Sequence, residues 1–228
     1  MRAHLQWLWV ACVAVAAGGC DADIGSPSDE MEAGDGAGAD GGTGGGGADS
    51  GSGADGGSDS CVEGWMELLV NPHFDQGPDV GWTSTGADII QREADMPIHV
   101  DSGEYAAWFG GKNELDANLA QPISVPDGAS DLRLSAKTCF VTAETAGTPD
   151  RVELILRDGG GAVAGTLTDF TNQDAGGICN WGNLQVSSSP AHAGQDLTFE
   201  IHVTTNATNH TSFYFDTLSL EALNECGQ

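Results

Sequence analysis

Residues 212–220 have the sequence Ser-Phe-Tyr-Phe-Asp-Thr-Leu-Ser-Leu, and this stretch decides the fold class. It is rich in aromatic and aliphatic residues and contains no Gly or Pro, which is typical of a β-strand. Successive side chains of a strand point to opposite faces, so the run divides into two sets. One set is Phe213, Phe215, Thr217 and Ser219, and the other is Tyr214, Asp216, Leu218 and Leu220. Asp is depleted in strands, which makes Asp216 the unusual residue of the run.

The same kind of pattern recurs along residues 61–228. Short runs of alternating apolar and polar residues are separated by clusters of Gly, Pro, Asn and Asp, and no stretch keeps a helical period over three turns. We expect strands at residues 66–70, 82–85, 88–91, 105–109, 118–125, 132–136, 151–157, 162–170, 183–187, 197–204 and 212–220. So many short strands predict an all-β domain, a single antiparallel β-sandwich of the jelly-roll type.

The charge of the chain excludes one large class of function. The formal net charge is −27, and residues 61–228 carry 24 of the 34 acidic residues but only six basic ones. Binding to nucleic acid through its phosphates requires a basic surface. We therefore expect no nucleic-acid partner, whereas so acidic a surface suits solubility and the binding of cations.

The N-terminal segment predicts export. Met1-Arg2 supplies a positive start, and residues 5–17 form an apolar run that is too short to span a bilayer but has the length of a signal-peptide core. The following Ala17-Gly18-Gly19-Cys20 resembles the lipobox of bacterial lipoproteins, whose cysteine is lipidated and becomes the first mature residue. The resemblance implies a signal peptide at 1–20, lipidation of Cys20 and a place in the bacterial cell envelope, periplasmic or surface-exposed. The alternative is an ordinary signal peptide cut near Gly19.

Residues 21–60 predict a disordered linker. They contain ten acidic residues, no basic ones and almost no apolar bulk among Gly, Ala and Ser. Such a segment cannot bury enough apolar surface to offset its conformational entropy, so it behaves as a flexible coil. We expect it to tether one monomeric domain, residues 61–228, to a membrane that the protein contacts only through its lipid anchor.

The cysteines divide by position. Cys61, Cys139, Cys179 and Cys226 lie in the domain, and four cysteines in an exported domain predict two disulfides with three possible pairings. We predict Cys61–Cys226, which would join the two ends of the domain, and Cys139–Cys179. Zinc binding by thiolates is not favoured, because the sequence has no Cys-x-x-Cys.

Three parts of the domain resemble a known family. Residues 68–77, followed by Gly81-Trp82, resemble the first strand of bacterial carbohydrate-binding-module jelly rolls. Residues 213–220 resemble their last strand, and the block 103–111 with the polar residues after it resembles extracellular modules of the galactose-binding-like type. The resemblance covers nearly all of residues 62–223, and it implies a β-sandwich that binds carbohydrate.

The resemblance also implies a structural calcium ion. Many such jelly rolls hold one where the first and last strands meet, and Ca²⁺ takes six to eight oxygen ligands. Asp75 occupies the acidic position that follows Phe74, and Asp216 occupies the acidic position of the last strand. We expect these two carboxylates to be metal ligands. The alternative is that Asp75 is a turn residue and Asp216 a solvated strand residue.

Aromatic and polar side chains are the candidates for sugar binding, because sugars stack on exposed rings and form hydrogen bonds with polar groups. Trp82 follows the first-strand motif and is expected in the core. Trp108 is either a platform for a sugar or a partly buried strand residue, and Trp181 is either a platform or the cover of a disulfide. Asn113 and Asp116 lie in a polar loop and complete the candidate ligand-binding set.

The sequence contains no GxSxG, HExxH or P-loop motif, so we expect no enzyme activity. We predict an exported, lipid-anchored binding protein that displays a glycan-binding jelly roll. The alternative is an adhesion or structural lipoprotein that binds a cell-surface protein. A cryptic hydrolase is a third interpretation, since so many carboxylates bring some pair to the spacing of a glycosidase by chance.

Overall fold

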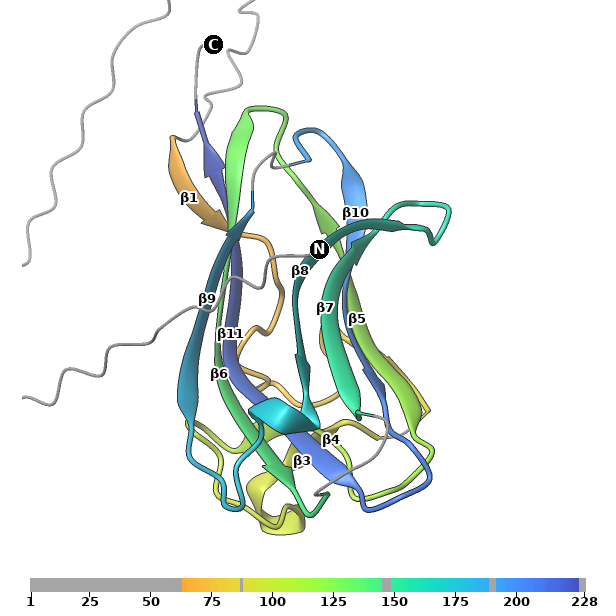
Figure 1. Ribbon diagram of the computed structural model, residues 1–228. Coiled ribbons are helices and arrows are strands. Elements are labelled where there is room, and N and C mark those ends of the chain that lie inside the picture. Colours follow the sequence, from red (N-terminus) through yellow and green to blue (C-terminus); the bar gives the residue numbers. More distant parts are fainter. Residues whose placement is uncertain (1–62, 87, 145–148, 189–191, 226–228) are drawn as a thin grey trace, which may run out of the picture. The chain divides into compact units, whose positions relative to one another are not determined.

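The computed structural model describes residues 63–86, 88–144, 149–188 and 192–225, which form a two-layer β-sandwich (Figure 1). These residues contain eleven strands and two 3₁₀ helices. The strands are β1 (Gly64–Glu67), β2 (Thr83–Thr85), β3 (Ile90–Arg92), β4 (Tyr105–Phe109), β5 (Asp116–Ser124), β6 (Ala129–Thr142), β7 (Arg151–Arg157), β8 (Val163–Thr171), β9 (Gly182–Ser188), β10 (Asp196–Thr204) and β11 (Thr211–Asn224). The helices are η1 (Glu93–Asp95) and η2 (Asn172–Asp174). Every strand overlaps a predicted run, and the predicted fold class is confirmed.

Both sheets are antiparallel throughout. One has the order β3-β4-β11-β6-β9, with β1 also paired to β11, and the other has the order β2-β5-β10-β7-β8. In Figure 1 strands β1, β6, β9 and β11 of the first sheet lie on the left, and strands β5, β7 and β10 of the second lie on the right. The first and last strands are direct neighbours, with Gly64 opposite Asn224 and Glu67 opposite Glu221.

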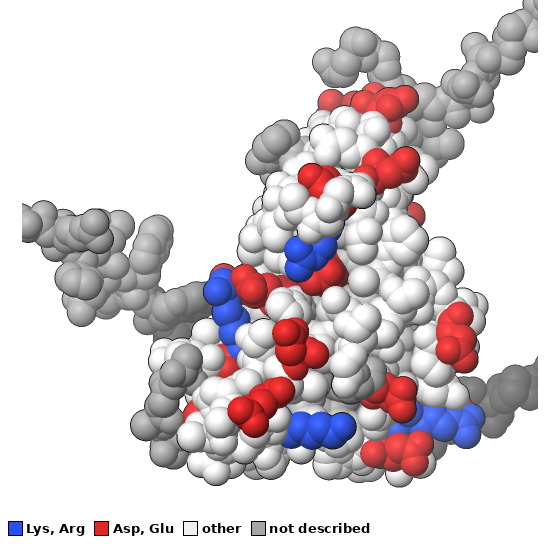
Figure 2. Space-filling view, turned by 90° about the vertical axis from the view of Figure 1, so that its right-hand side faces the viewer, with Lys and Arg blue, Asp and Glu red and all other residues white. Residues whose placement is uncertain are grey.

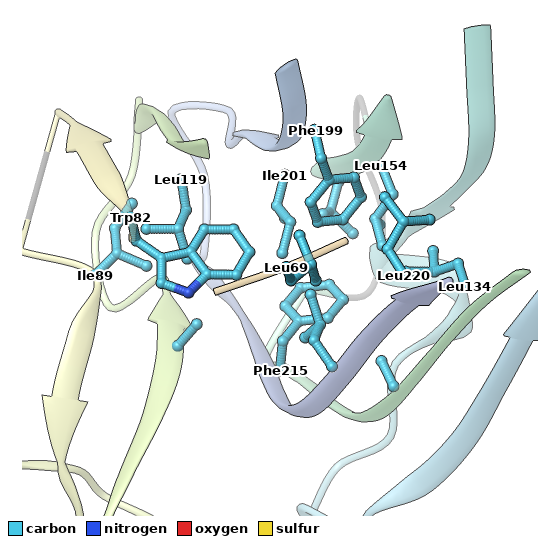
Figure 3. Close-up of a cluster of buried hydrophobic side chains, with 14 of the residues drawn as sticks. Leu69, Trp82, Ile89, Leu119, Leu134, Leu154, Phe199, Ile201, Phe215 and Leu220 are labelled. Carbon is cyan, nitrogen blue, oxygen red and sulfur yellow. The ribbon is translucent and has the colours of Figure 1, made fainter. Parts of the chain in front are cut away.

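The core lies between the two sheets. Alternate positions of β5, β7 and β10 are buried, and they meet the inward side chains of β4, β6 and β11. Figure 3 shows Trp82 among these side chains, and the indole is 5% exposed. Its ring centroid lies 5.5 Å from that of Phe74 and 6.2 Å from that of Phe199, and its Nε1 donates to the carbonyl oxygen of Asn71 at 3.0 Å. The prediction that Trp82 is a core residue is confirmed.

Strand β11 changes face part-way along, and the strict alternation predicted from the sequence is wrong there. The side chains of Phe213, Phe215, Leu218 and Leu220 all belong to the core. The register with β6 shifts between Asp216 and Ser219, and Thr217 adopts a positive φ of 49°. This is a β-bulge, whose extra residue moves the following side chains to the other face.

The Sγ atoms of Cys139 and Cys179 are bonded, with Cα atoms 5.5 Å apart, so β6 is joined to the segment that follows η2 as predicted. The predicted Cys61–Cys226 disulfide, the lipidation site Cys20 and the linker 21–60 lie outside the described residues. Within the described part of the chain, no helix has the length and apolar character needed to cross a membrane.

Trp82→Ala is expected to lower the free energy of unfolding by about 3–5 kcal/mol, because it removes a buried aromatic side chain and leaves a cavity. Trp65→Ala is the matched control, since Trp65 is 39% exposed and packs under the Arg133 guanidinium at 4.2 Å. This variant is expected to cost about 1 kcal/mol, as for an exposed cation–π pair. Urea denaturation of both variants measures the difference, and equal losses would contradict the assignment of Trp82 to the core.

Candidate functional site

A hollow of about 220 Å³ beside Trp108 is the candidate ligand site. Its wall comes from the turn before β3, from β3 itself, and from the end of β4 with the turn into β5. The polar groups that line it are those of Asp88, Gln91 and Lys112, together with the half-buried indole of Trp108. A ring, an acceptor, an amide and an ammonium group therefore face one small space.

The position of the Trp108 ring is fixed by β11. Trp108 lies opposite Tyr214 in the pairing of β4 with β11, and the two rings stack with centroids 5.9 Å apart and planes at 15°. The indole Nε1 donates to the Ser212 hydroxyl at 3.2 Å. Burial raises the pKa of the Tyr214 hydroxyl, so this ring stays neutral and apolar beneath the indole.

Two glycines allow the turn after β4 to pass close to this ring. Gly110 has φ 152° and Gly111 has φ 70°, which are backbone conformations that residues with a Cβ rarely adopt. A Cβ at Gly110 would lie 2.6 Å from the Cα of Ser212, and one at Gly111 would lie 3.0 Å from Cζ2 of Trp108. The turn therefore needs glycine at both positions to keep its course beside the indole.

The other predicted ligand-binding residues do not line this hollow. Asn113 donates from Nδ2 to the carbonyl oxygen of Ala207 at 3.2 Å, and Asp116 Oδ1 lies 2.8 Å from His202 Nε2. Trp181 donates from Nε1 to the carbonyl oxygen of His99 at 3.0 Å. Of the four candidates, only Trp108 lies at the hollow. Lys112, the first residue of the polar loop 112–116 that was predicted to face a ligand, also lines it, whereas Asp88 and Gln91 are lining residues that the sequence did not single out.

The two predicted calcium ligands hold one loop, residues 101–104. Asp216 is fully buried, and its Oδ2 accepts the backbone N–H groups of Asp101 and Ser102, each at 2.9 Å. Asp75 Oδ1 accepts the N–H of Glu104 at 3.1 Å. A Cβ on Gly103 would lie 1.7 Å from this oxygen, so the loop passes directly against Asp75. The structure thus brings both aspartates to the same loop.

The described hydrogen-bond donors around these two aspartates do not use all the lone pairs of their carboxylate oxygens, so a cation could bind there. Asp216 Oδ1 accepts the N–H of Thr217 at 2.6 Å, so three N–H groups share a carboxylate that can accept about four bonds. Among the described residues, no side chain or backbone group donates to Oδ2 of Asp75. These residues hold no cluster of three or more His, Cys, Asp or Glu side chains, so a calcium ion here would need carbonyl or water oxygens as well. Calcium at Asp75 and Asp216 stays a prediction.

The outer face of the second sheet carries paired charges. Arg157 bonds both carboxylate oxygens of Glu200, from Nε and Nη2 at 2.8 Å each. Arg151 lies 2.9 Å from Glu153 and 3.1 Å from Asp169. Figure 2 faces the side of the molecule where β5, β7 and β10 lie, and the blue groups at its mid-height lie beside red ones. Strand alternation, which the sequence carries, is the signal that places these side chains outward.

No protein-family model matches this chain, and no curated protein matches it. Solved structures do have similar backbones. TmCBM61 in complex with β-1,4-galactotriose is 19% identical with a TM-score of 0.48, over 70% of this chain and 99% of that one. The CBM22-1 xylan-binding domain from Paenibacillus barcinonensis Xyn10C is 18% identical with a TM-score of 0.43, over 72% and 99%. The K3 cleaved adhesin domain of Lys-gingipain from Porphyromonas gingivalis is 16% identical with a TM-score of 0.47, over 69% and 99%. Because all three TM-scores are below 0.5, the fold assignment rests on the sheets of this chain.

Burial raises the pKa of the Asp216 carboxyl, and the N–H groups that lower it compensate only in part. An acid whose folded-state pKa is raised adds stability below its unfolded pKa and loses that contribution as the pH rises through the folded value. In a calcium chelator, the free energy of unfolding of the wild type is therefore expected to fall relative to that of Asp216→Asn as the pH rises from about 4. Denaturation at several pH values measures it, and a flat or opposite trend would contradict burial as the dominant influence on this carboxyl.

Proposed function

We propose that this chain is a non-enzymatic binding module that holds a short glycan at the hollow beside Trp108. The observation that carries the proposal is the half-buried indole of Trp108, which stacks on the Tyr214 ring and lines a space together with three polar side chains. A sugar ring has an apolar face and a rim of hydroxyl groups. The apolar face would stack on the indole, while the carboxylate of Asp88, the amide of Gln91 and the ammonium of Lys112 would bond the hydroxyls.

The lining of the hollow favours binding over hydrolysis. A glycosidase needs two carboxyl groups that flank the bond to be cleaved. Asp88 is the only carboxylic acid among the described residues that line this space. The buried carboxyl of Asp216 is enclosed by backbone N–H groups and is not one of the lining groups. A single carboxyl group can bind a hydroxyl, but it cannot supply the two separate carboxyl groups that a glycosidase uses.

A cell-surface protein is the second candidate partner, and the outer face of the second sheet favours it. Its arginines already pair with carboxylates of the same face, and no Trp, Tyr or Phe belongs to the network that they form in the described residues. A polar surface of this kind suits recognition by complementary charges, whereas it offers no ring for a sugar to stack on.

Trp108→Ala is expected to lower the affinity for a bound glycan at least tenfold, because it removes the stacking surface. Asp88→Ala is expected to lower it several-fold, and this exposed side chain can be removed without disturbing the core. The charge-matched control is Asp196→Ala, which changes the start of β10 at the opposite end of β5 from the hollow and is expected to leave affinity unchanged.

A glycan array with the purified full chain, in calcium and again in chelator, first identifies the ligand, and calorimetry then compares the variants. Retained affinity in both Trp108→Ala and Asp88→Ala would move the site elsewhere. An array without a hit in either condition would shift the assignment to a protein-binding lipoprotein.

We further propose that the domain is displayed from a bacterial membrane by a lipid on Cys20, with the linker 21–60 as a spacer and a structural calcium ion at Asp75 and Asp216. The apolar run and the small residues before Cys20 support the anchor. The single sandwich with its own core supports action as a monomer, since no second chain is needed to cover its inner faces.

Cys20→Ser is expected to abolish incorporation of radiolabelled palmitate in a bacterial host and to release the protein from the membrane fraction. Cys12→Ser is the matched control, because Cys12 lies inside the predicted signal peptide and its loss is expected to leave labelling unchanged. Palmitate labelling that persists in Cys20→Ser would contradict the anchor.

A further inference from the structure

A second group of acidic and amide side chains gathers at one end of the sandwich. The strand pairings bring four chain segments together there. Thr211 lies opposite Thr142, Thr204 opposite Arg151, and Arg151 opposite Thr171. The residues just beyond these pairs therefore meet, and they are Glu144, Asp150, Asn172, Asn206 and Thr208.

The side chains of this cluster are joined by hydrogen bonds. Glu144 Oε1 accepts Nδ2 of Asn206 at 2.9 Å and the hydroxyl of Thr208 at 2.5 Å, while its Oε2 accepts Nδ2 of Asn172 at 2.9 Å. Asp150 Oδ1 accepts the backbone N–H of Asn206 at 2.7 Å, and the carbonyl oxygen of Asp150 accepts the N–H of Asn172 at 3.1 Å. The five residues thus form one network.

Two oxygen atoms of this network are buried and have no hydrogen-bond donor among the described residues. They are Oδ2 of Asp150 and Oδ1 of Asn172. Asp150 is 0% exposed, so water at the surface does not solvate its second oxygen. Leaving such an atom without a partner destabilises the folded state, and more so for a charged group. A ligand that accepts lone pairs would remove this cost.

The cluster also lacks a compensating positive charge. Glu144 is 7% exposed, and the donors to its carboxylate are the neutral side chains of Asn172, Asn206 and Thr208. Among the ion pairs of the described residues, none involves Glu144 or Asp150, and the neighbouring Arg151 pairs with Glu153 and Asp169 instead. Buried carboxylates are normally paired with a cation or bound to a metal.

We propose that this cluster binds a Ca²⁺ ion through Asp150 Oδ2 and Asn172 Oδ1, with Glu144 as the second negative charge beside it. All the available donors are carboxylate and amide oxygens, which are the ligands that hard divalent cations prefer. The site is separate from the predicted one at Asp75 and Asp216, which lies against the loop 101–104.

The ion would also stabilise the candidate glycan site. The turn that carries Asn206 is bonded to the loop after β4, because Glu114 N–H donates to the carbonyl oxygen of Asn206 at 2.8 Å and the Thr205 hydroxyl donates to the carbonyl oxygen of Lys112 at 3.1 Å. Lys112 lines the hollow. A cation that holds the turn therefore holds one wall of the hollow as well.

The test counts calcium ions bound per chain by equilibrium dialysis of the purified full chain, in wild type and in Asp150→Asn. Asn keeps the oxygen that accepts the N–H of Asn206 but removes the charge. We expect Asp150→Asn to bind one Ca²⁺ fewer than the wild type at millimolar calcium. Asp169→Asn is the control, since it makes the same chemical change at an exposed carboxylate of β8 and is expected to bind as many ions as the wild type.

Asp216→Asn distinguishes the two proposed sites. This variant is expected to lose an ion bound at Asp75 and Asp216 but to keep the ion at Asp150. If circular dichroism shows that Asp150→Asn is unfolded, Asn172→Ala decides, with an expected loss of at least tenfold in affinity for one ion. A wild-type chain that binds no calcium would overturn the proposal. So would equal binding by wild type, Asp150→Asn and Asn172→Ala, a result that would assign an ordered water to these oxygens.

Discussion

The pairing of β11 with three other strands is the interaction on which the rest of the structure depends. β6 lies along one edge of β11, and β1 and β4 share the other edge. The bulge at Thr217 allows two phenylalanines before it and two leucines after it to enter the same core. It also directs the Asp216 carboxylate to the loop 101–104. The bulge therefore determines both the apolar packing on the inner face of β11 and the position of the buried Asp216 carboxylate on its outer face.

The two-residue period was sufficient to predict the strands, because every second residue of β7 and β10 belongs to the core and β5 alternates between buried and more exposed positions. It could not place Leu218 and Leu220, since a bulge depends on packing between sheets rather than on local pattern. Trp108 could be identified as a candidate from its residue type alone. Its partners Asp88, Gln91 and Lys112 come from separate turns and strands, and no local pattern relates them. The polar cluster around Asp150 is visible only once strand register is known.

Two buried carboxylates in this domain have opposite surroundings. Asp216 is enclosed by three N–H donors, which neutralise part of its charge and fix a loop. Among the described residues, Asp150 has one donor on one oxygen and none on the other. Both carboxylate oxygens of Asp216 therefore have a donor from the protein, whereas the second oxygen of Asp150 has none among the described residues. The pairing of β4 with β11 holds Trp108 against Tyr214, so a strand rather than a loop positions the proposed sugar platform.

The dependence of the fold on the Asp216 carboxylate is measured most directly by amide hydrogen exchange at Asp101 and Ser102. These two N–H groups lie in a loop outside the strands, and Asp216 accepts both of them. We expect these two amides to exchange about as slowly as amides of β11 in the wild type, and far faster in Asp216→Ala. Exchange in the wild type as fast as that of exposed turn amides would contradict the claim that this carboxylate ties the loop to β11.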